Sequence, residues 1–134
     1  MKYTIKQAAE KVNLTVYTLR YYDKEGLLPF VERDNMGNRL FTENNVEWLE
    51  MICCLKNTGM SLRQIKQYIQ LCMQGDATLE VRRQILMEHR QGVLDQIDEL
   101  NRNLERIDYK IEHYNTTCNL HFVAEPACPA VQSA

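Results

Sequence analysis

The chain has 134 residues, of which 45% are hydrophobic and 25% are charged, and its formal net charge is −2. It begins without a long apolar run, and no stretch approaches the roughly 20 apolar residues of a membrane span, so we expect a cytoplasmic protein without signal peptide or membrane contact. The cysteine count of five is odd, which argues against a structural disulfide framework in such a chain.

The charge is distributed unevenly along the chain. Residues 1–74 hold ten lysines and arginines against eight acids, a net +2, and residues 75–134 hold six against ten, a net −4. A weakly basic first part is therefore followed by an acidic second part. This excess is too small to identify a nucleic-acid partner by itself.

The first 26 residues predict a helix-turn-helix. Thr4–Gln7 has the form of a capping box, and the apolar residues that follow at helical spacing are Ile5, Ala8, Ala9 and Val12. Thr15 can cap a second short helix, and Gly26 supplies the left-handed residue that ends it after Glu25. Two short helices with a three-residue turn between them make this motif.

The second helix has one face of a distinct kind. Its Leu19 and Tyr22 are spaced to meet the first helix, and the side chains expected to point outward are Tyr17, Arg20, Tyr21 and Lys24. Arginine can bind phosphate or guanine through two parallel hydrogen bonds, and tyrosine hydroxyls can bind phosphate oxygens. The face fits DNA, and it fits equally well a solvated helix face with partly packed tyrosines.

Residues 30–41, "FVERDNMGNRLF", have apolar ends around the turn-forming residues 34–38, which predicts a hairpin of two short strands. This hairpin would be a small wing. Arg33 and Arg39 bracket its turn and would project toward a duplex engaged by the second helix. The alternative is that both arginines contact only water.

Two more helices complete the predicted first domain, residues 1–74. Thr42 can cap a third helix that ends near Gly59, with apolar residues at Val46, Leu49, Ile52 and Cys53. Ser61–Gln64 is a second capping box, and the fourth helix has apolar residues at Leu62, Ile65, Ile69 and Cys72.

Residues 75–115 predict one long helix with a heptad pattern of apolar residues. The seam is complete from residue 93 to residue 114, and its members are Val93, Ile97, Leu100, Leu104, Ile107, Ile111 and Tyr114. Such a helix spans roughly 60 Å, so its apolar edge requires a partner helix. We expect a homodimer; the alternatives are a different partner chain and an intramolecular hairpin.

Four segments in this order resemble the MerR family of transcriptional regulators, over about residues 3 to 115. They are "TLRYYDKEGLLP" (18–29), "RDNMGNRLF" (33–41), "LKNTGMSLRQIKQYI" (55–69) and the long coiled helix, with Thr4 ahead of them. The resemblance implies a mainly α fold, a winged helix-turn-helix dimer joined by an antiparallel coiled coil. It also implies binding to a dyad-symmetric operator in double-stranded promoter DNA, where the dimer distorts the spacer and so improves contact with RNA polymerase.

The resemblance also assigns the DNA contacts. The second helix, from Thr15 to Glu25, would enter the major groove, with Tyr17 and Arg20 as candidates for base edges or adjacent phosphates. Phosphate candidates are found in the second helix and the wing, and Thr4 could position another phosphate through backbone amides. The expected DNA-binding residues are Thr4, Thr15, Tyr17, Arg20, Tyr21, Arg33 and Arg39.

Only about 20 residues follow Tyr114, so we expect no multidrug-binding domain and look for the signal at cysteines. The segment "EMICCLKNTGMS" resembles the aldehyde- and thiol-stress-responsive branch of the family, in which a single cysteine takes the place of Cys54. Electrophiles would alkylate its thiolate, and Lys56 offers a nearby positive charge. The alternative is that Cys53 and Cys54 are packing residues, which we favour for Cys53 because it lies on the apolar stripe.

A second sensing hypothesis concerns the C-terminal tail, residues 116–134. Cys118 and Cys128, with His121 between them, could hold a soft metal ion such as Cu(I). Their spacing is longer than the usual copper loop, and Thr78 stands where divalent-metal sensors have cysteine. We favour a disordered tail with incidental cysteines, and no cofactor.

Two other classes of protein fit the sequence less well. No nucleophile–base pair, carboxylate pair or glycine-rich phosphate loop is evident, so we expect no enzyme. A coiled-coil adaptor without DNA binding would explain the heptads and the acidic tail. It would leave Arg20, Tyr21 and Arg39 at the family's contact positions unexplained.

Overall fold

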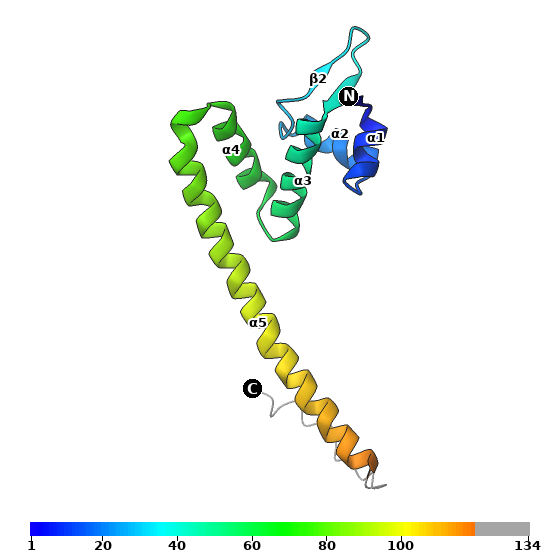
Figure 1. Ribbon diagram of the computed structural model, residues 1–134, viewed down its shortest axis with the longest axis vertical. Coiled ribbons are helices and arrows are strands. Elements are labelled where there is room, and N and C mark those ends of the chain that lie inside the picture. Colours follow the sequence, from blue (N-terminus) through cyan, green and yellow to red (C-terminus); the bar gives the residue numbers. More distant parts are fainter. Residues whose placement is uncertain (120–134) are drawn as a thin grey trace. The chain divides into compact units, whose positions relative to one another are not determined.

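The computed structural model describes the backbone of residues 1–119 and the side chains of residues 1–117. The described chain is mainly helical, as expected (Figure 1). Its elements in chain order are β1 (Lys2–Tyr3), α1 (Ile5–Lys11), α2 (Val16–Lys24), β2 (Glu32–Arg33), β3 (Arg39–Thr42), α3 (Glu43–Asn57), α4 (Leu62–Met73), the short 3-10 helix η1 (Asp76–Thr78) and α5 (Leu79–Asn119).

Four predicted helix starts are confirmed. In each case a hydroxyl at the N-cap accepts a hydrogen bond from a backbone N–H in the first turn, and the capping residues are Thr4, Thr15, Thr42 and Ser61. The predicted capping boxes at α1 and α4 are complete. A third box closes the start of α3, where Asn45 takes the position usual for glutamate or glutamine.

The wing belongs to a three-stranded antiparallel sheet in the order β1-β3-β2. The predicted hairpin is confirmed, with Arg33 opposite Arg39 in register. The strand β1, which has two residues and pairs Tyr3 with Phe41, was not predicted from the sequence. The Tyr3 hydroxyl donates to the carboxylate of Glu43, which ties this edge strand to the start of α3.

The core of the first part of the chain comes from every element up to α4 except β2, whose two residues are exposed. Its fully buried large side chains are Leu19, Leu27, Phe41, Leu49, Ile52, Leu55, Ile65 and Ile69. Leu19 and Tyr22 are buried, as their spacing predicted. On α3, Val46, Leu49 and Ile52 are buried as predicted, but the next buried residue is Leu55, and Cys53 is only half-buried.

A long helix is present as predicted, but α5 begins at Leu79 and not at residue 75, because Gly75 has a φ of +87° and Asp76–Thr78 form the 3-10 helix η1. The chain divides into two compact units, Met1–Arg90 and a second unit that starts at Gln91, so the boundary falls inside this helix. In the second unit the seam is exposed in the single chain: Leu100 is 67% exposed and Leu104 is 52% exposed. No helix within the part of the chain described here is long and apolar enough to cross a membrane.

Candidate nucleic-acid interface

The exposed face of α2 groups the side chains that the sequence singled out. Four of them line one shallow depression, and they are Tyr17, Arg20, Tyr21 and Lys24. Tyr17 is 71% exposed and Tyr21 is 44% exposed, so neither ring is a core residue. Because positions three and four apart share a helix face, this geometry follows directly from the spacing.

The hydroxyl at the start of α2 is engaged in capping. Thr15 Oγ1 accepts a hydrogen bond from the backbone N–H of Thr18 at 3.0 Å and lies 2.9 Å from the Thr18 hydroxyl. Thr4 has the same place at the start of α1, where its exposed hydroxyl accepts from the N–H of Gln7 at 3.2 Å. Both threonines therefore fix helix starts, and a role in DNA binding stays a prediction for each.

The turn of the wing is built around one carboxylate. Asp34 Oδ1 accepts hydrogen bonds from the backbone N–H groups of Met36 and Asn38, each at 2.9 Å. The bond from Asn38 is the main reason why the pKa of Asp34 is lowered from its ordinary value. Gly37 has a φ of +84°, the left-handed conformation that the turn requires.

The two wing arginines meet the same residue of α2. Arg39 Nε donates to Asp23 Oδ2 at 2.5 Å, and both side chains are only 20% exposed. Arg33 is 53% exposed; its Nη2 lies 3.5 Å from the same oxygen, and its Nη1 donates to the carbonyl of Gly37 at 2.8 Å. The sequence predicted arginines that project from the wing, and the structure adds an ion-pair cluster that joins the wing to α2.

The two adjacent cysteines of α3 differ in their surroundings. Cys54 is exposed, which the sequence alone could not show, and Cys53 is half-buried. Burial raises the pKa of the Cys53 thiol above its ordinary value, and the nearby carboxylate of Glu50 adds to this effect. Of the pair, Cys54 is the more accessible to a reagent in solution.

A short chain of hydrogen bonds runs from Cys54 to α5. Thr58 Oγ1 donates to the backbone carbonyl of Cys54 at 2.7 Å, and it lies 2.7 Å from Nε2 of His89. A hydroxyl has one hydrogen to donate, so this arrangement makes His89 the donor to Thr58. The end of the cysteine-bearing helix is thus tied to the first part of α5, which the sequence did not predict.

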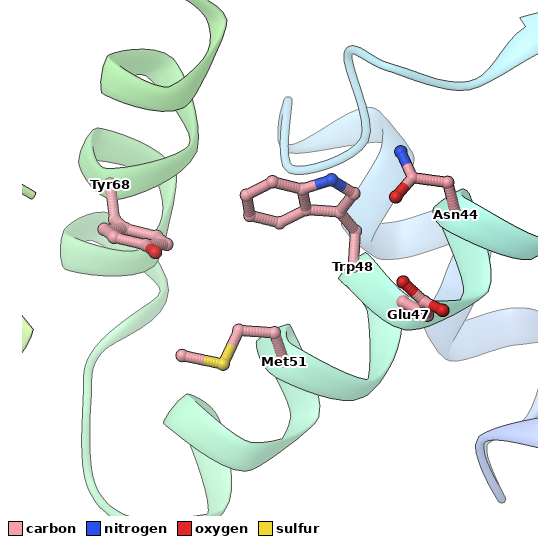
Figure 2. A pocket seen from close by; sticks show the side chains of 5 residues that line it. All are labelled: Asn44, Glu47, Trp48, Met51 and Tyr68. Atoms are coloured by element: carbon pink, nitrogen blue, oxygen red, sulfur yellow. The ribbon is translucent and has the colours of Figure 1, made fainter. Parts of the chain in front are cut away.

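A shallow aromatic pocket lies between α3 and α4 (Figure 2). It is lined by Asn44, Glu47, Trp48, Met51 and Tyr68. Figure 2 shows Trp48 and Tyr68 projecting from the two helices toward each other, and their ring centroids are 6.5 Å apart. The same indole lies 6.1 Å from the ring of Phe30, so Trp48 packs the wing region, α3 and α4 together.

No group of three or more His, Cys, Asp and Glu side chains in the described residues is arranged to hold a metal ion. Thr78, the position compared with the cysteine of divalent-metal sensors, is buried and its hydroxyl lies 2.6 Å from the carbonyl of Leu71. The candidate metal ligands Cys118, His121 and Cys128 have side chains outside the described residues.

Comparisons with known proteins identify the family. Residues 3–72 match the family described as MerR HTH family regulatory protein, and residues 46–109 match the family described as MerR, DNA binding. The chain is 48% identical over 114 residues to an uncharacterized HTH-type transcriptional regulator of Haemophilus influenzae, covering 85% of this chain and 84% of that protein. The chain therefore belongs to the MerR family of helix-turn-helix regulators.

Other matches agree with this assignment. The chain is 40% identical over 91 residues to the HTH-type transcriptional regulator AdhR of Bacillus subtilis, covering 68% of this chain and 65% of that protein. Among solved structures, it is similar to HiNmlR, a MerR family regulator lacking the sensor domain, bound to promoter DNA, with a TM-score of 0.82 and 46% identity over 91% of this chain and 97% of that one. A MerR family regulator from Bacillus thuringiensis gives a TM-score of 0.78 at 45% identity, over 85% and 100%.

Proposed function

We propose that this chain is a promoter-binding transcriptional regulator that acts as a homodimer and answers to electrophile or thiol stress. The single observation that carries the DNA-binding part is the exposed face of α2, where Tyr17, Arg20, Tyr21 and Lys24 lie together. The similarity to a MerR family regulator bound to promoter DNA supports it. In this proposal α2 enters the major groove, and the wing contacts the flanking phosphates.

The proposed homodimer rests on the apolar seam of α5. Four of its members, Ile97, Leu100, Leu104 and Ile107, are between 49% and 67% exposed in the single chain. Burying a leucine or isoleucine side chain contributes about 1.5–3 kcal/mol, so two such seams have a strong reason to pair in an antiparallel coiled coil. A dimer of this kind presents two copies of α2 to a dyad-symmetric operator, where it would activate transcription by RNA polymerase through distortion of the promoter spacer.

The proposed sensor is Cys54. Cys54 is exposed, its backbone carbonyl accepts a hydrogen bond from the Thr58 hydroxyl, and that hydroxyl is also hydrogen-bonded to His89 of α5. In this proposal, modification of the thiol is transmitted to α5 through these two hydrogen bonds. In the chemical step, the Cys54 thiolate sulfur attacks the electrophilic carbon of an aldehyde, a C–S bond forms, and the carbonyl oxygen takes the electron pair and a proton. The 40% identity to AdhR and the resemblance of residues 50–61 to the thiol-stress branch support this assignment.

The proposal needs no bound cofactor. The alternative is a metal-responsive regulator in which Cys118 and Cys128 hold a soft ion such as Cu(I). The two hypotheses differ in the cysteines they require, so one set of variants separates them. Enzymatic activity forms no part of either hypothesis, and the relatives are transcriptional regulators.

The test is induction of a reporter driven by the promoter region of this chain's own gene. It is challenged separately with a reactive aldehyde and with copper in wild type, Cys54→Ser and a Cys118→Ser/Cys128→Ser double variant. Cys53→Ser is the matched control, because it removes the neighbouring thiol from the same helix. Immunoblots confirm equal protein levels.

The thiol-sensor proposal predicts that aldehyde induces the reporter in every background except Cys54→Ser. Copper induction that is lost only in the tail double variant would support the metal alternative and contradict the role of Cys54. Equal aldehyde induction in Cys54→Ser and wild type would also contradict it.

A further inference from the structure

The recognition helix α2 carries an acidic residue, Asp23, in its last turn, beside the face proposed to bind DNA. An acid is unfavourable at this end of a helix, because the helix dipole places partial negative charge there. It is also unfavourable near phosphates, which it repels. Neither helix stability nor charge attraction to DNA explains an acid at this position, and the explanation lies in the side chains that Asp23 contacts.

Asp23 lies between two arginines that would otherwise repel each other. Arg33 and Arg39 are directly opposite in the pairing of β2 with β3, and like charges in that relation destabilise a sheet. Asp23 Oδ2 is 2.5 Å from Arg39 Nε and 3.5 Å from Arg33 Nη2. The carboxylate neutralises part of this charge and fastens both strands of the wing to α2.

The contact also fixes the orientation of the Arg39 guanidinium. The side chains of Asp23 and Arg39 are only 20% exposed, so solvent screens this pair less than an ion pair at the open surface. The Nε–H of Arg39 donates to Asp23. The two amino groups of the same guanidinium can still donate to a phosphate. Held at Nε, the guanidinium has a fixed plane and needs less ordering when DNA arrives.

We infer that Asp23 is a positioning residue for DNA binding: its carboxylate orients Arg39 and fixes the wing relative to α2, so that both reach the duplex as one surface. This inference rests on the proposed DNA-binding function. Arg33, which is more exposed and more distant from the carboxylate, exchanges its contact with Asp23 for phosphate when the complex forms.

We predict that Asp23→Asn weakens DNA binding. Asp23→Asn removes a negative charge close to DNA, and charge alone would strengthen binding. Loss of orientation weakens it, by about tenfold if one charged hydrogen bond is lost. Glu25→Gln is the matched control, because Glu25 is exposed, stands two residues further on, and forms no ion pair with any described residue.

The measurement is fluorescence anisotropy with a labelled duplex from the chain's own promoter region, and with a scrambled duplex of equal length, at several salt concentrations. We expect Asp23→Asn to bind the promoter duplex about tenfold more weakly with a shallower salt dependence, Asp23→Glu to recover part of the affinity, and Glu25→Gln to bind at least as tightly as wild type. In an Arg39→Met background, Asp23→Asn should cause no further loss.

Binding by Asp23→Asn that equals or exceeds that of Glu25→Gln, or losses that add in the double variant, would overturn the inference. Circular dichroism checks that each variant is folded. If Asp23→Asn is not folded, the Arg39→Lys variant tests the inference instead, because lysine keeps the positive charge but lacks the Nε–H that donates to Asp23. Weaker DNA binding by Arg39→Lys supports the inference, and unchanged binding overturns it. A wild-type chain that does not distinguish the promoter duplex from the scrambled one would instead contradict the proposed function, and the inference with it.

Discussion

Two parts of the chain differ in the burial of their large apolar side chains. In residues 1–90, Leu19, Phe41 and Leu49 are completely buried within a core made by the chain itself. In the part of α5 that follows, Leu100 and Leu104 are more than half exposed. The first part is stabilised by its own packing, whereas the distal helix would bury its seam only in the proposed dimer, since most helical stability in proteins comes from tertiary contacts.

The largest expected effect comes from placing charge in the seam. We predict that Leu100→Asp/Leu104→Asp raises the dissociation constant of the dimer at least about 100-fold, because pairing would bury unpaired carboxylates. Sedimentation analysis over a concentration series measures this. The control is Asn101→Asp/Asn103→Asp, which adds the same charge at exposed positions beside the seam. Equal dimerisation of the two double variants would contradict the proposed interface.

A core deletion should affect the first part of the chain at every protein concentration. We predict that Leu49→Ala, at a completely buried position, lowers the free energy of unfolding by about 3 kcal/mol. Thermal unfolding is measured across a range of protein concentrations. Leu104→Ala should lower the midpoint only where the chain is dimeric, because its side chain has no partner in the monomer. An equal loss of stability for both variants at high dilution would contradict this difference between the two parts of the chain.

The neighbouring cysteines should differ in rate of alkylation. At pH 7.5 we predict that iodoacetamide modifies Cys54 about tenfold faster than Cys53, since Cys54 is exposed and burial raises the pKa of Cys53. Labelling of Cys53 should then increase as the pH rises, because its raised pKa means that more of the reactive thiolate forms at higher pH. Trypsin releases residues 40–56, a peptide that contains these two cysteines and no other.

Fragment-ion mass spectrometry of that peptide assigns the label to one residue or the other. The Cys54→Ser variant provides the rate of Cys53 alone. Faster labelling of Cys53 at pH 7.5 would show that exposure in the single chain does not determine access to the thiol.

The smallest predicted effect concerns a helix cap. Thr42→Ala should lower the free energy of unfolding by about 1 kcal/mol, because the hydroxyl of Thr42 accepts the N–H of Asn45 at the start of α3. Thr116→Ala is the comparison in the distal helix, where the hydroxyl donates to the carbonyl of Glu112 in the same helix. It should be close to neutral, since alanine favours helix interiors. Chemical denaturation measures both variants.

Local sequence signals predicted much of this fold because they act over a few residues. Thr4, Thr15, Thr42 and Ser61 could be identified as caps from the residues that follow them, and the heptad pattern identified α5. The strand β1 was missed, because two residues carry no periodicity and pair with β3, which lies almost 40 positions away.

The candidate site was predictable in part for the same reason. The face of α2 follows from helical spacing, so Tyr17, Arg20 and Tyr21 were grouped correctly from sequence. The contact of Asp23 with Arg39 joins residues 16 positions apart in different elements, and the contact of Thr58 with His89 joins residues 31 apart. Neither contact has a local pattern, so only the packed structure shows it.

The most direct test of a dimeric regulator is the stoichiometry of its complex with DNA. Sedimentation velocity of a labelled duplex from the chain's own promoter region, titrated with protein at several salt concentrations, reports the number of chains bound and the salt dependence. We predict two chains per duplex, preference over a scrambled duplex, and affinity that falls steeply as salt rises. One chain per duplex, or equal binding to the scrambled sequence, would contradict it.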